Sequence, residues 1–252
     1  MTAGGVLVTR PLGQERPLVA ALEQAGFQAV HAPLIAIEPL PSPDPVQRSL
    51  LLDLADTPHV IFVSRNAITH GMAWIEDFWP QLPVGVNWYT VGASSAALLA
   101  EHGIRALQPA AEMTSEGLLA LPSLQAVADQ RVLILKGEGG RSLIRETLAQ
   151  RGARVRKLVV YRRTVPAYAP GEFSARLRDS GCQSILISSG EGLDNMVSLL
   201  EPESLAAARQ LTLVVPGERV AQAAAAAGFP RVAIADNATD EAMVAAVCAL
   251  AS

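Results

Sequence analysis

Short apolar runs alternate with longer amphipathic segments along most of the chain. The runs are rich in β-branched residues and too short for helices, which is typical of strands buried on both faces. Between them, leucine, alanine and charged residues recur every three or four positions, which predicts helices. We expect strands within residues 6–9, 27–37, 60–64, 89–92, 104–109, 132–135, 153–163, 185–189, 211–215 and 231–236. This alternation predicts an α/β fold with parallel sheets covered by helices on both faces.

Several residues mark the expected helix ends. Gly26 and Gly152 follow the first helix of each half, where glycine can take the left-handed conformation that ends a helix. Thr114 and Thr239 precede the closing helix of each half and are expected to be their N-caps.

The two halves of the chain resemble each other at a shift of about 125 residues. Residues 60–68 align with 184–193, so that Ser64 meets Ser189, and at a shift of 126 the segment VLVTRP (6–11) aligns with VLILKG (132–137). A repeat of this length with matching turns indicates an internal duplication.

Proline-rich connectors occupy equivalent places in the two halves, at 33–45 and 165–172. If the chain crosses between lobes at both, lobe one consists of residues 1–35 and 167–252 and lobe two of residues 40–160, with a two-stranded connector at 34–40 and 160–167. Two such crossovers would form a hinge and leave a cleft between the lobes. The alternative is two contiguous lobes that divide near residue 126.

Composition narrows the class of protein. Half of the 252 residues are hydrophobic, which supports packed cores and excludes a disordered chain. The net charge of −4 gives no basic face for nucleic acid. Cys182 and Cys248 cannot form a disulfide framework, and no signal peptide or membrane-length apolar run is recognisable. We therefore expect a reduced, cytoplasmic protein that binds neither nucleic acid nor membrane.

The turns after the strands carry small hydroxyl residues, glycines and basic residues. Ligands of doubly wound sheets bind at these turns, where helix N-termini attract anions. Any one such turn is also what an ordinary strand–helix connection requires, but six of them, five with a base at or beside them, favour a polyanion site. The candidate binding residues are Arg10, Ser64, Arg65, Ser95, Lys136, Gly137, Arg141, Ser188, Ser189, Gly217 and Arg219.

Signatures of other sites are missing from the sequence. The segment GEGGR (137–141) matches neither the dinucleotide fingerprint nor the P-loop, and no nucleophile elbow is present. His31, His59, His70 and His102 have none of the zinc-ligand spacings, so no metal site is expected.

Tyr161 is the candidate catalytic residue. It ends a predicted strand where the second connector begins, and its duplicate position is Ile35, so the repeat is broken there. A phenol, with a usual pKa of about 10, keeps its proton at neutral pH and could donate a hydrogen bond to a leaving oxygen. A tyrosine that caps a strand with its ring buried is the alternative.

With these residues the chain resembles the bacterial-type uroporphyrinogen-III synthase family over its whole length. The resemblance rests on VLVTRP (6–11), FVSRNA (62–67), VGASSA (91–96), KGEGGR (136–141) and VYRR (160–163). It implies two α/β lobes joined by a two-stranded connector, the first lobe built from both chain ends.

The resemblance also implies a lyase of haem biosynthesis that uses no metal or organic cofactor. It would cyclise the polycarboxylate hydroxymethylbilane to uroporphyrinogen III, with inversion of ring D and loss of water. Tyr161 would assist departure of the hydroxyl group, and Ser95 matches a hydroxyl position that is usually threonine. A second threonine found in some members is absent from Gly217-Glu218-Arg219-Val220, which leaves Arg219 as a carboxylate ligand instead.

The sequence alone leaves the partners and the functional class of the protein open. We expect a monomer, and a transient contact with hydroxymethylbilane synthase, which supplies the unstable substrate, is left open by the sequence. A non-catalytic two-lobed module that binds or senses small anions would explain the hinge and the turns equally well, although the missing signal peptide is atypical of a periplasmic receptor.

Overall fold

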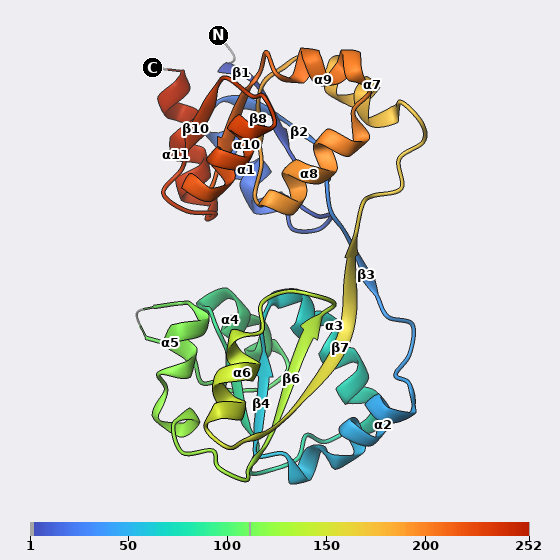
Figure 1. The fold of residues 1–252 in the computed structure, drawn as a ribbon, viewed down its shortest axis with the longest axis vertical. Coiled ribbons are helices and arrows are strands. Elements are labelled where there is room, and N and C mark those ends of the chain that lie inside the picture. The colour runs from blue at the N-terminus through green and yellow to red at the C-terminus, as the bar shows by residue number, and fades with distance from the viewer. Residues whose placement is uncertain (1–2, 111, 252) are drawn as a thin grey trace. The chain divides into compact units, whose positions relative to one another are not determined.

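The computed structural model describes residues 3–110 and 112–251. The chain divides into two compact units, unit 1 (Met1–Ile37 and Thr164–Ser252) and unit 2 (Glu38–Arg163). Each unit holds one five-stranded sheet with helices packed against it (Figure 1). The predicted α/β class with parallel sheets is confirmed.

The sheet of unit 1 combines strands from both ends of the chain. Its order is β10-β9-β8-β1-β2, formed by Val232–Ile234, Thr212–Val215, Cys182–Leu186, Ala3–Val8 and Phe27–His31. All four pairings are parallel. Because β1 lies between β2 and β8, a contiguous lobe that ends near residue 126 does not describe this sheet.

Both faces of the unit 1 sheet are buried, which explains its continuous apolar strands. Leu7 and Ile185 pack on one face with α7 (Glu172–Asp179), α8 (Gly190–Leu199) and α10 (Glu218–Ala226). Val8 and Leu186 pack on the other face with α1 (Arg16–Gln24) and α11 (Asp240–Leu250). The short helix α9 (Pro202–Ala208) lies against α7.

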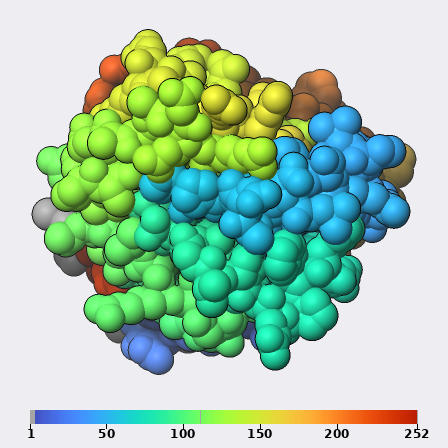
Figure 2. Space-filling view, turned by 90° about the horizontal axis from the view of Figure 1, so that it is seen from below, coloured from blue at the N-terminus to red at the C-terminus, as the bar shows by residue number. Residues whose placement is uncertain are grey.

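The sheet of unit 2 has the order β3-β7-β6-β4-β5. These strands are Ala36–Pro39, Arg154–Thr164, Arg131–Gly137, His59–Phe62 and Asn87–Thr90. Helix α3 (Arg65–Phe78) packs on one face, while α5 (Ser115–Leu119) and α6 (Leu143–Gln150) cover the other. Helices α2 (Pro45–Leu52) and α4 (Ala93–Glu101) and the short turns η1 (Asp53–Asp56) and η2 (Pro122–Leu124) complete the unit. Figure 2 views this unit from below, with the blue α2 segment beside the yellow-green segments near the starts of β6 and β7.

The expected helix ends are confirmed. Gly26 and Gly152 have φ values of 89° and 83° after helices α1 and α6. The side chains of Thr114 and Thr239 accept hydrogen bonds from the backbone N–H groups of Gly117 and Ala242.

Two strand predictions are wrong in part. The expected strand 27–37 is interrupted between β2 and β3, near Pro33, which has no N–H group for a sheet ladder. Residues 104–109 form no strand, and only Leu107 makes a single bridge to Tyr89. Pro109 follows, so this ladder cannot continue.

The boundaries between the units fall after Ile37 and after Arg163, inside the expected connectors 34–40 and 160–167. Strands β3 and β7 are neighbours here, and the Leu40 N–H donates to the Val160 carbonyl at 3.0 Å. None of the helices in residues 3–110 and 112–251 has the length and apolarity that crossing a membrane requires.

The buried hydroxyl of Thr9 ties the two chain ends of unit 1 together, since it donates to the Leu186 carbonyl at 2.5 Å. We expect Thr9→Val to cost about 1–2 kcal/mol of unfolding free energy, because the carbonyl loses its partner. The melting temperature should fall by roughly 2–8 °C. Thr212→Val makes the same change on β9 and is the control. Equal melting temperatures for both variants would contradict this role.

Candidate active site

The carboxyl ends of β4 and β6 lie side by side because the two strands are parallel. Ser64 and Gly137 stand at these ends, and a cavity of about 470 Å³ opens beside them. Its base is apolar and includes Ile134 and Ile144, which belong to the core under α6. The cavity therefore lies at the point where this core ends at the carboxyl edge of the sheet, the usual ligand position in α/β folds.

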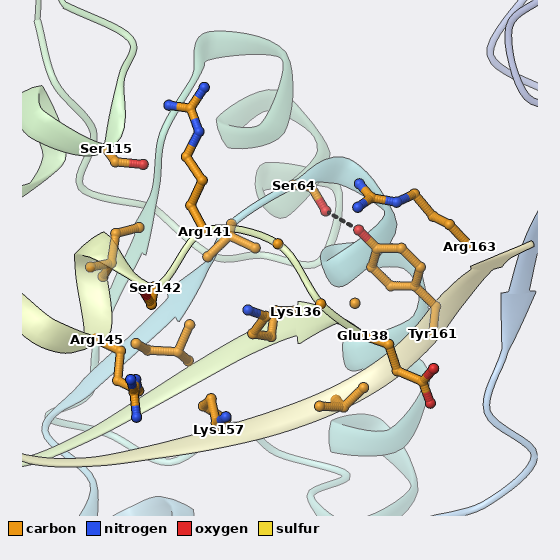
Figure 3. A pocket seen from close by; sticks show the side chains of 17 residues that line it. Ser64, Ser115, Lys136, Glu138, Arg141, Ser142, Arg145, Lys157, Tyr161 and Arg163 are labelled. Atoms are coloured by element: carbon orange, nitrogen blue, oxygen red, sulfur yellow. Dashed lines mark hydrogen bonds between the residues drawn. The ribbon is translucent and has the colours of Figure 1, made fainter. Parts of the chain in front are cut away.

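Strand β7 supplies one wall of the cavity through alternate residues. Lys157, Val159, Tyr161 and Arg163 all line it, while Val155 on the same face packs into the core below. A strand places every second side chain on one face, so a single strand carries two cations and a phenol into one cavity (Figure 3).

The position of Tyr161 depends on the absence of a side chain at Gly137. A Cβ atom built on Gly137 would lie 2.6 Å from two ring carbons of Tyr161 and 3.0 Å from its hydroxyl oxygen. The register of β6 and β7 shifts between Lys136 and Gly137, so that Gly137 pairs with Tyr161. The ring therefore lies against bare backbone, and only 5% of the residue is exposed.

Two polar neighbours surround the Tyr161 ring. The hydroxyl groups of Tyr161 and Ser64 are 3.2 Å apart, within a hydrogen bond, and the Ser64 oxygen also accepts from the Ala67 N–H at the start of α3. The His70 ring centroid lies 5.9 Å from that of Tyr161, and burial lowers the pKa of His70. The lowered pKa disfavours a positive charge on this imidazole beside the phenol.

The cavity is strongly cationic. One carboxylate, that of Glu138, lines it together with five cations: Lys136, Arg141, Arg145, Lys157 and Arg163. Burial lowers the pKa of Lys136, and the positive charges of Lys157, Arg145 and Arg163 lower it further. The chain as a whole carries a net charge of −4, so the positive charge is concentrated locally and suits an anionic ligand.

The loop after β6 requires glycine. Gly139 and Gly140 have φ values of 66° and 76°, a region that other residues rarely adopt. This turn carries the chain from Lys136 back over the cavity to Arg141 and the start of α6.

Five of the sequence-predicted site residues meet at this cavity. They are Ser64, Lys136, Gly137, Arg141 and Tyr161. The other candidates in unit 2 do not line it: Arg65 donates to the Ser94 carbonyl at 2.9 Å, and Ser95 is buried in the first turn of α4.

The candidates in unit 1 lie at the carboxyl edge of that unit's own sheet. Arg10 forms an ion pair with Asp240, and Ser189 caps α8. The Ser188 hydroxyl is buried and has no hydrogen-bond partner within the described part of the chain. Gly217 precedes α10 with Arg219 in its exposed first turn. Their role in binding stays a prediction.

Sequence reasoning missed six polar residues of the cavity: Ser115, Glu138, Ser142, Arg145, Lys157 and Arg163. Lys157 and Arg163 of β7 could have been predicted, because they lie four residues before and two residues after Tyr161 and therefore share its face. The serines and Arg145 belong to the helix starts of α5 and α6, and their approach to β7 depends on tertiary packing.

A second cavity in unit 2, of about 270 Å³, has a mixed charge. It is lined by Asp53 together with Arg131, Arg154 and Arg156. Arg131 lies 3.9 Å from the Asp53 carboxylate and 4.0 Å from that of Asp56. Asp53 and Asp56 belong to a single 3₁₀ turn, and both side chains are exposed. The charges are partly balanced here, which distinguishes this cavity from the first.

Comparison with known proteins identifies a family for nearly the whole chain. The family model described as uroporphyrinogen-III synthase HemD matches residues 16–245. The uroporphyrinogen-III synthase of Escherichia coli (strain K12) is 33% identical over 248 residues, which covers 96% of this chain and 99% of that protein.

Two crystal structures share the fold. That of uroporphyrinogen-III synthetase from Helicobacter pylori 26695 has a TM-score of 0.62 and 14% identity, and covers 98% of this chain and 100% of that one. That of a mutant uroporphyrinogen III synthase from the extremely thermophilic bacterium Thermus thermophilus has a TM-score of 0.58 and 18% identity, and covers 98% and 97%.

The close approach of Gly137 to Tyr161 predicts a selective defect. In Gly137→Ala the new methyl group must displace the phenol, and a shift of about 1 Å at a reacting group costs on the order of 10²-fold in rate. We expect a loss of turnover of this size in a folded protein. Gly92→Ala is the matched control, because a Cβ there meets only the Met113 sulfur, at 4.0 Å. Equal turnover in the two variants would show that the ring position is not critical.

Proposed function

The chain belongs to the uroporphyrinogen-III synthase family, and on this premise we propose that Tyr161 is the general acid of its reaction and that the cationic cavity binds part of the substrate. The family's reaction belongs to tetrapyrrole biosynthesis and converts hydroxymethylbilane, a small molecule, into uroporphyrinogen III. This activity is favoured over a module that only binds or senses anions. The phenol of Tyr161 beside five cations in one cavity is the observation that carries the proposal.

The chemistry of the substrate explains the charge of the cavity. Hydroxymethylbilane carries eight carboxylates, and ammonium and guanidinium groups bind carboxylates through charge-assisted hydrogen bonds. We assign Lys136 and Arg141 to this binding, with the backbone of Gly137 and the hydroxyl of Ser64 beside them. The candidates outside the cavity would serve the remaining carboxylates.

The first chemical step is cleavage of the C–O bond of the hydroxymethyl group, which leaves an azafulvenium cation. The Tyr161 O–H would donate its proton to the leaving oxygen, so that water departs. Loss of the cation's pyrrole N–H proton, which can return to the Tyr161 phenolate, then gives the neutral azafulvene. If the Ser64 hydroxyl donates to the Tyr161 oxygen, the phenol's own proton stays available to the cavity. The Ser64 oxygen can do this while it accepts from the Ala67 N–H, since a hydroxyl both donates and accepts.

The later steps demand orientation more than acid–base chemistry. Ring D must attack the azafulvene carbon through its own substituted carbon, which gives a spiro intermediate that fragments and closes with the ring reversed. Holding two ends of one molecule for such a closure is an entropic contribution, and it can supply several kcal/mol of barrier reduction. Binding of the substrate's carboxylates at the rigid edge of the sheet would hold the two ends of the molecule in place for this closure.

A coupled assay tests the proposal. Porphobilinogen and hydroxymethylbilane synthase generate the substrate in place, and the oxidised uroporphyrin isomers are separated by chromatography. We expect isomer III with the wild-type chain and a turnover about 10²–10⁴-fold lower in Tyr161→Phe, with little change in KM, because a general acid acts in the transition state.

Tyr168→Phe is the control for the loss of a phenol hydroxyl, since Tyr168 donates to the Pro33 carbonyl in unit 1, outside the cavity. Unchanged turnover in Tyr161→Phe would remove this residue from the mechanism. Isomer I alone from a folded wild-type chain would overturn the enzymatic activity and favour the binding module.

We further propose that the chain works in the cytoplasm as a monomer that contacts hydroxymethylbilane synthase transiently. Two cysteines, Cys182 and Cys248, are too few for a disulfide framework, which suits a reducing compartment. An unstable substrate favours direct transfer between enzymes. Sedimentation should give a 26.5 kDa species for the chain alone and a larger average mass in the mixture. A stable dimer of the chain alone would contradict the monomer. An unchanged average mass in the mixture with hydroxymethylbilane synthase would contradict the transient contact.

A further inference from the structure

The two lysines of this chain lie together. The sequence holds 20 lysines and arginines, and of these only Lys136 and Lys157 are lysine. Arginine is thus the ordinary base of this protein, yet both exceptions line the same cavity. An ammonium group is a compact point charge on a flexible stem, whereas guanidinium is a broad planar fork. The placement therefore brings both compact cations of the chain to one cavity, beside three arginines.

The two lysines stand on adjacent strands and on one face of the sheet. Lys157 of β7 pairs in register with Ile134 of β6, and Lys136 is two residues beyond Ile134. Residues two apart on a strand share a face, and Ile134 lines the cavity as well. In Figure 3 Lys136 lies between Lys157 and Tyr161. Both ammonium groups can thus reach one small ligand that also touches the phenol.

The cluster is unfavourable for the unliganded protein. Burial lowers the pKa of Lys136, and repulsion from the positive charges of Lys157, Arg145 and Arg163 lowers it further. Within residues 3–110 and 112–251 neither lysine forms an ion pair or a hydrogen bond with another side chain. A bound dianion would relieve this repulsion, and any ligand that binds only the folded state also stabilises it.

The size of the cavity limits the ligand to part of the substrate. A volume of about 470 Å³ is near the lower end of pockets that hold a drug-sized molecule, so one substituted pyrrole fits better than a chain of four. Tyr161 lines the same cavity, and the ring closest to its phenol would be the one that bears the hydroxymethyl group.

We propose that Lys136 and Lys157 seat the acetate and the propionate of the pyrrole ring that carries the leaving hydroxyl. The inference rests on the proposed function, since it takes the role of Tyr161 as given. It assigns the lysine pair a positioning role: with both acid side chains held on β6 and β7, the hydroxymethyl group of that ring is directed to the Tyr161 hydroxyl.

Binding of two stable ring systems tests the lysine pair without any turnover. Uroporphyrinogen III carries an acetate and a propionate on each ring, whereas coproporphyrinogen III carries methyl groups in place of the acetates. Both are kept reduced under nitrogen and titrated into the wild-type chain, Lys136→Gln/Lys157→Gln and Arg156→Gln. Arg156 is the matched control, because it is the neighbour of Lys157 on β7 but lines the second cavity.

We expect the wild-type chain and Arg156→Gln to prefer uroporphyrinogen III, and the double variant to lose at least 10-fold of that preference. Removal of the ammonium groups should also raise the melting temperature of the unliganded double variant by roughly 1–3 °C, because repulsion is relieved. If the two lysines had a purely structural role, their replacement would lower the melting temperature. If the double variant kept the full preference for uroporphyrinogen III over coproporphyrinogen III, the inference would be wrong.

The kinetic readout separates this inference from the proposed function. In the coupled assay the double variant should raise KM and release more isomer I, because a loosely held ring closes without inversion. If Tyr161→Phe turns over normally while the lysine variant still loses its preference, the acid assignment fails and the carboxylate seat stands. If only Tyr161→Phe is impaired, the seat is wrong and the acid assignment stands.

Discussion

The parallel pairing of β6 with β7 is the constraint on which the site depends. This ladder sets Lys136 beside Val159, and the register shift that follows places Gly137 opposite Tyr161. Only a residue without Cβ leaves room for the ring there, so the backbone of one strand determines the position of a side chain on the next. The phenol, Lys136 and the Ser64 hydroxyl then share one edge because parallel strands end together, and Lys157 lies on the same face farther from that edge, opposite Ile134.

The same geometry brings positive charges close together in the cavity, where they repel one another. Five cations around one cavity reduce the stability of the free chain, and a carboxylate ligand offsets this. Proteins tolerate such local cost where function requires it. In the second cavity Arg131 is close to the carboxylates of Asp53 and Asp56. In the first cavity Arg145 pairs with Glu146, whereas Lys136 and Lys157 form no ion pair within the described residues. The unbalanced cluster, not the number of basic residues, indicates where an anionic ligand belongs.

Most of the fold could be predicted from local patterns in the sequence. Buried apolar strands, glycines at helix ends and threonine N-caps are decided within a few residues, and these predictions are confirmed. The single bridge at Leu107 and the interruption near Pro33 were not predicted, although a proline that cannot donate to a sheet ladder lies close to each. Five site residues met at one cavity, but the contribution of α6, including Arg145, depends on packing that no local pattern encodes.

The duplication predicted from the sequence pairs the site residues of unit 2 with different residues in unit 1. At the shift of 126 residues, Lys136 corresponds to Arg10, Gly137 to Pro11 and Tyr161 to Ile35. In unit 1 the equivalent base is neutralised, because Arg10 pairs with the Asp240 carboxylate and donates to the Ala238 carbonyl at 2.8 Å. Ile35 offers no hydroxyl for proton transfer. The same strand–turn position therefore stabilises one unit as an ion pair and leaves an uncompensated cation in the other, which is why we assign the acid and its carboxylate seat to unit 2.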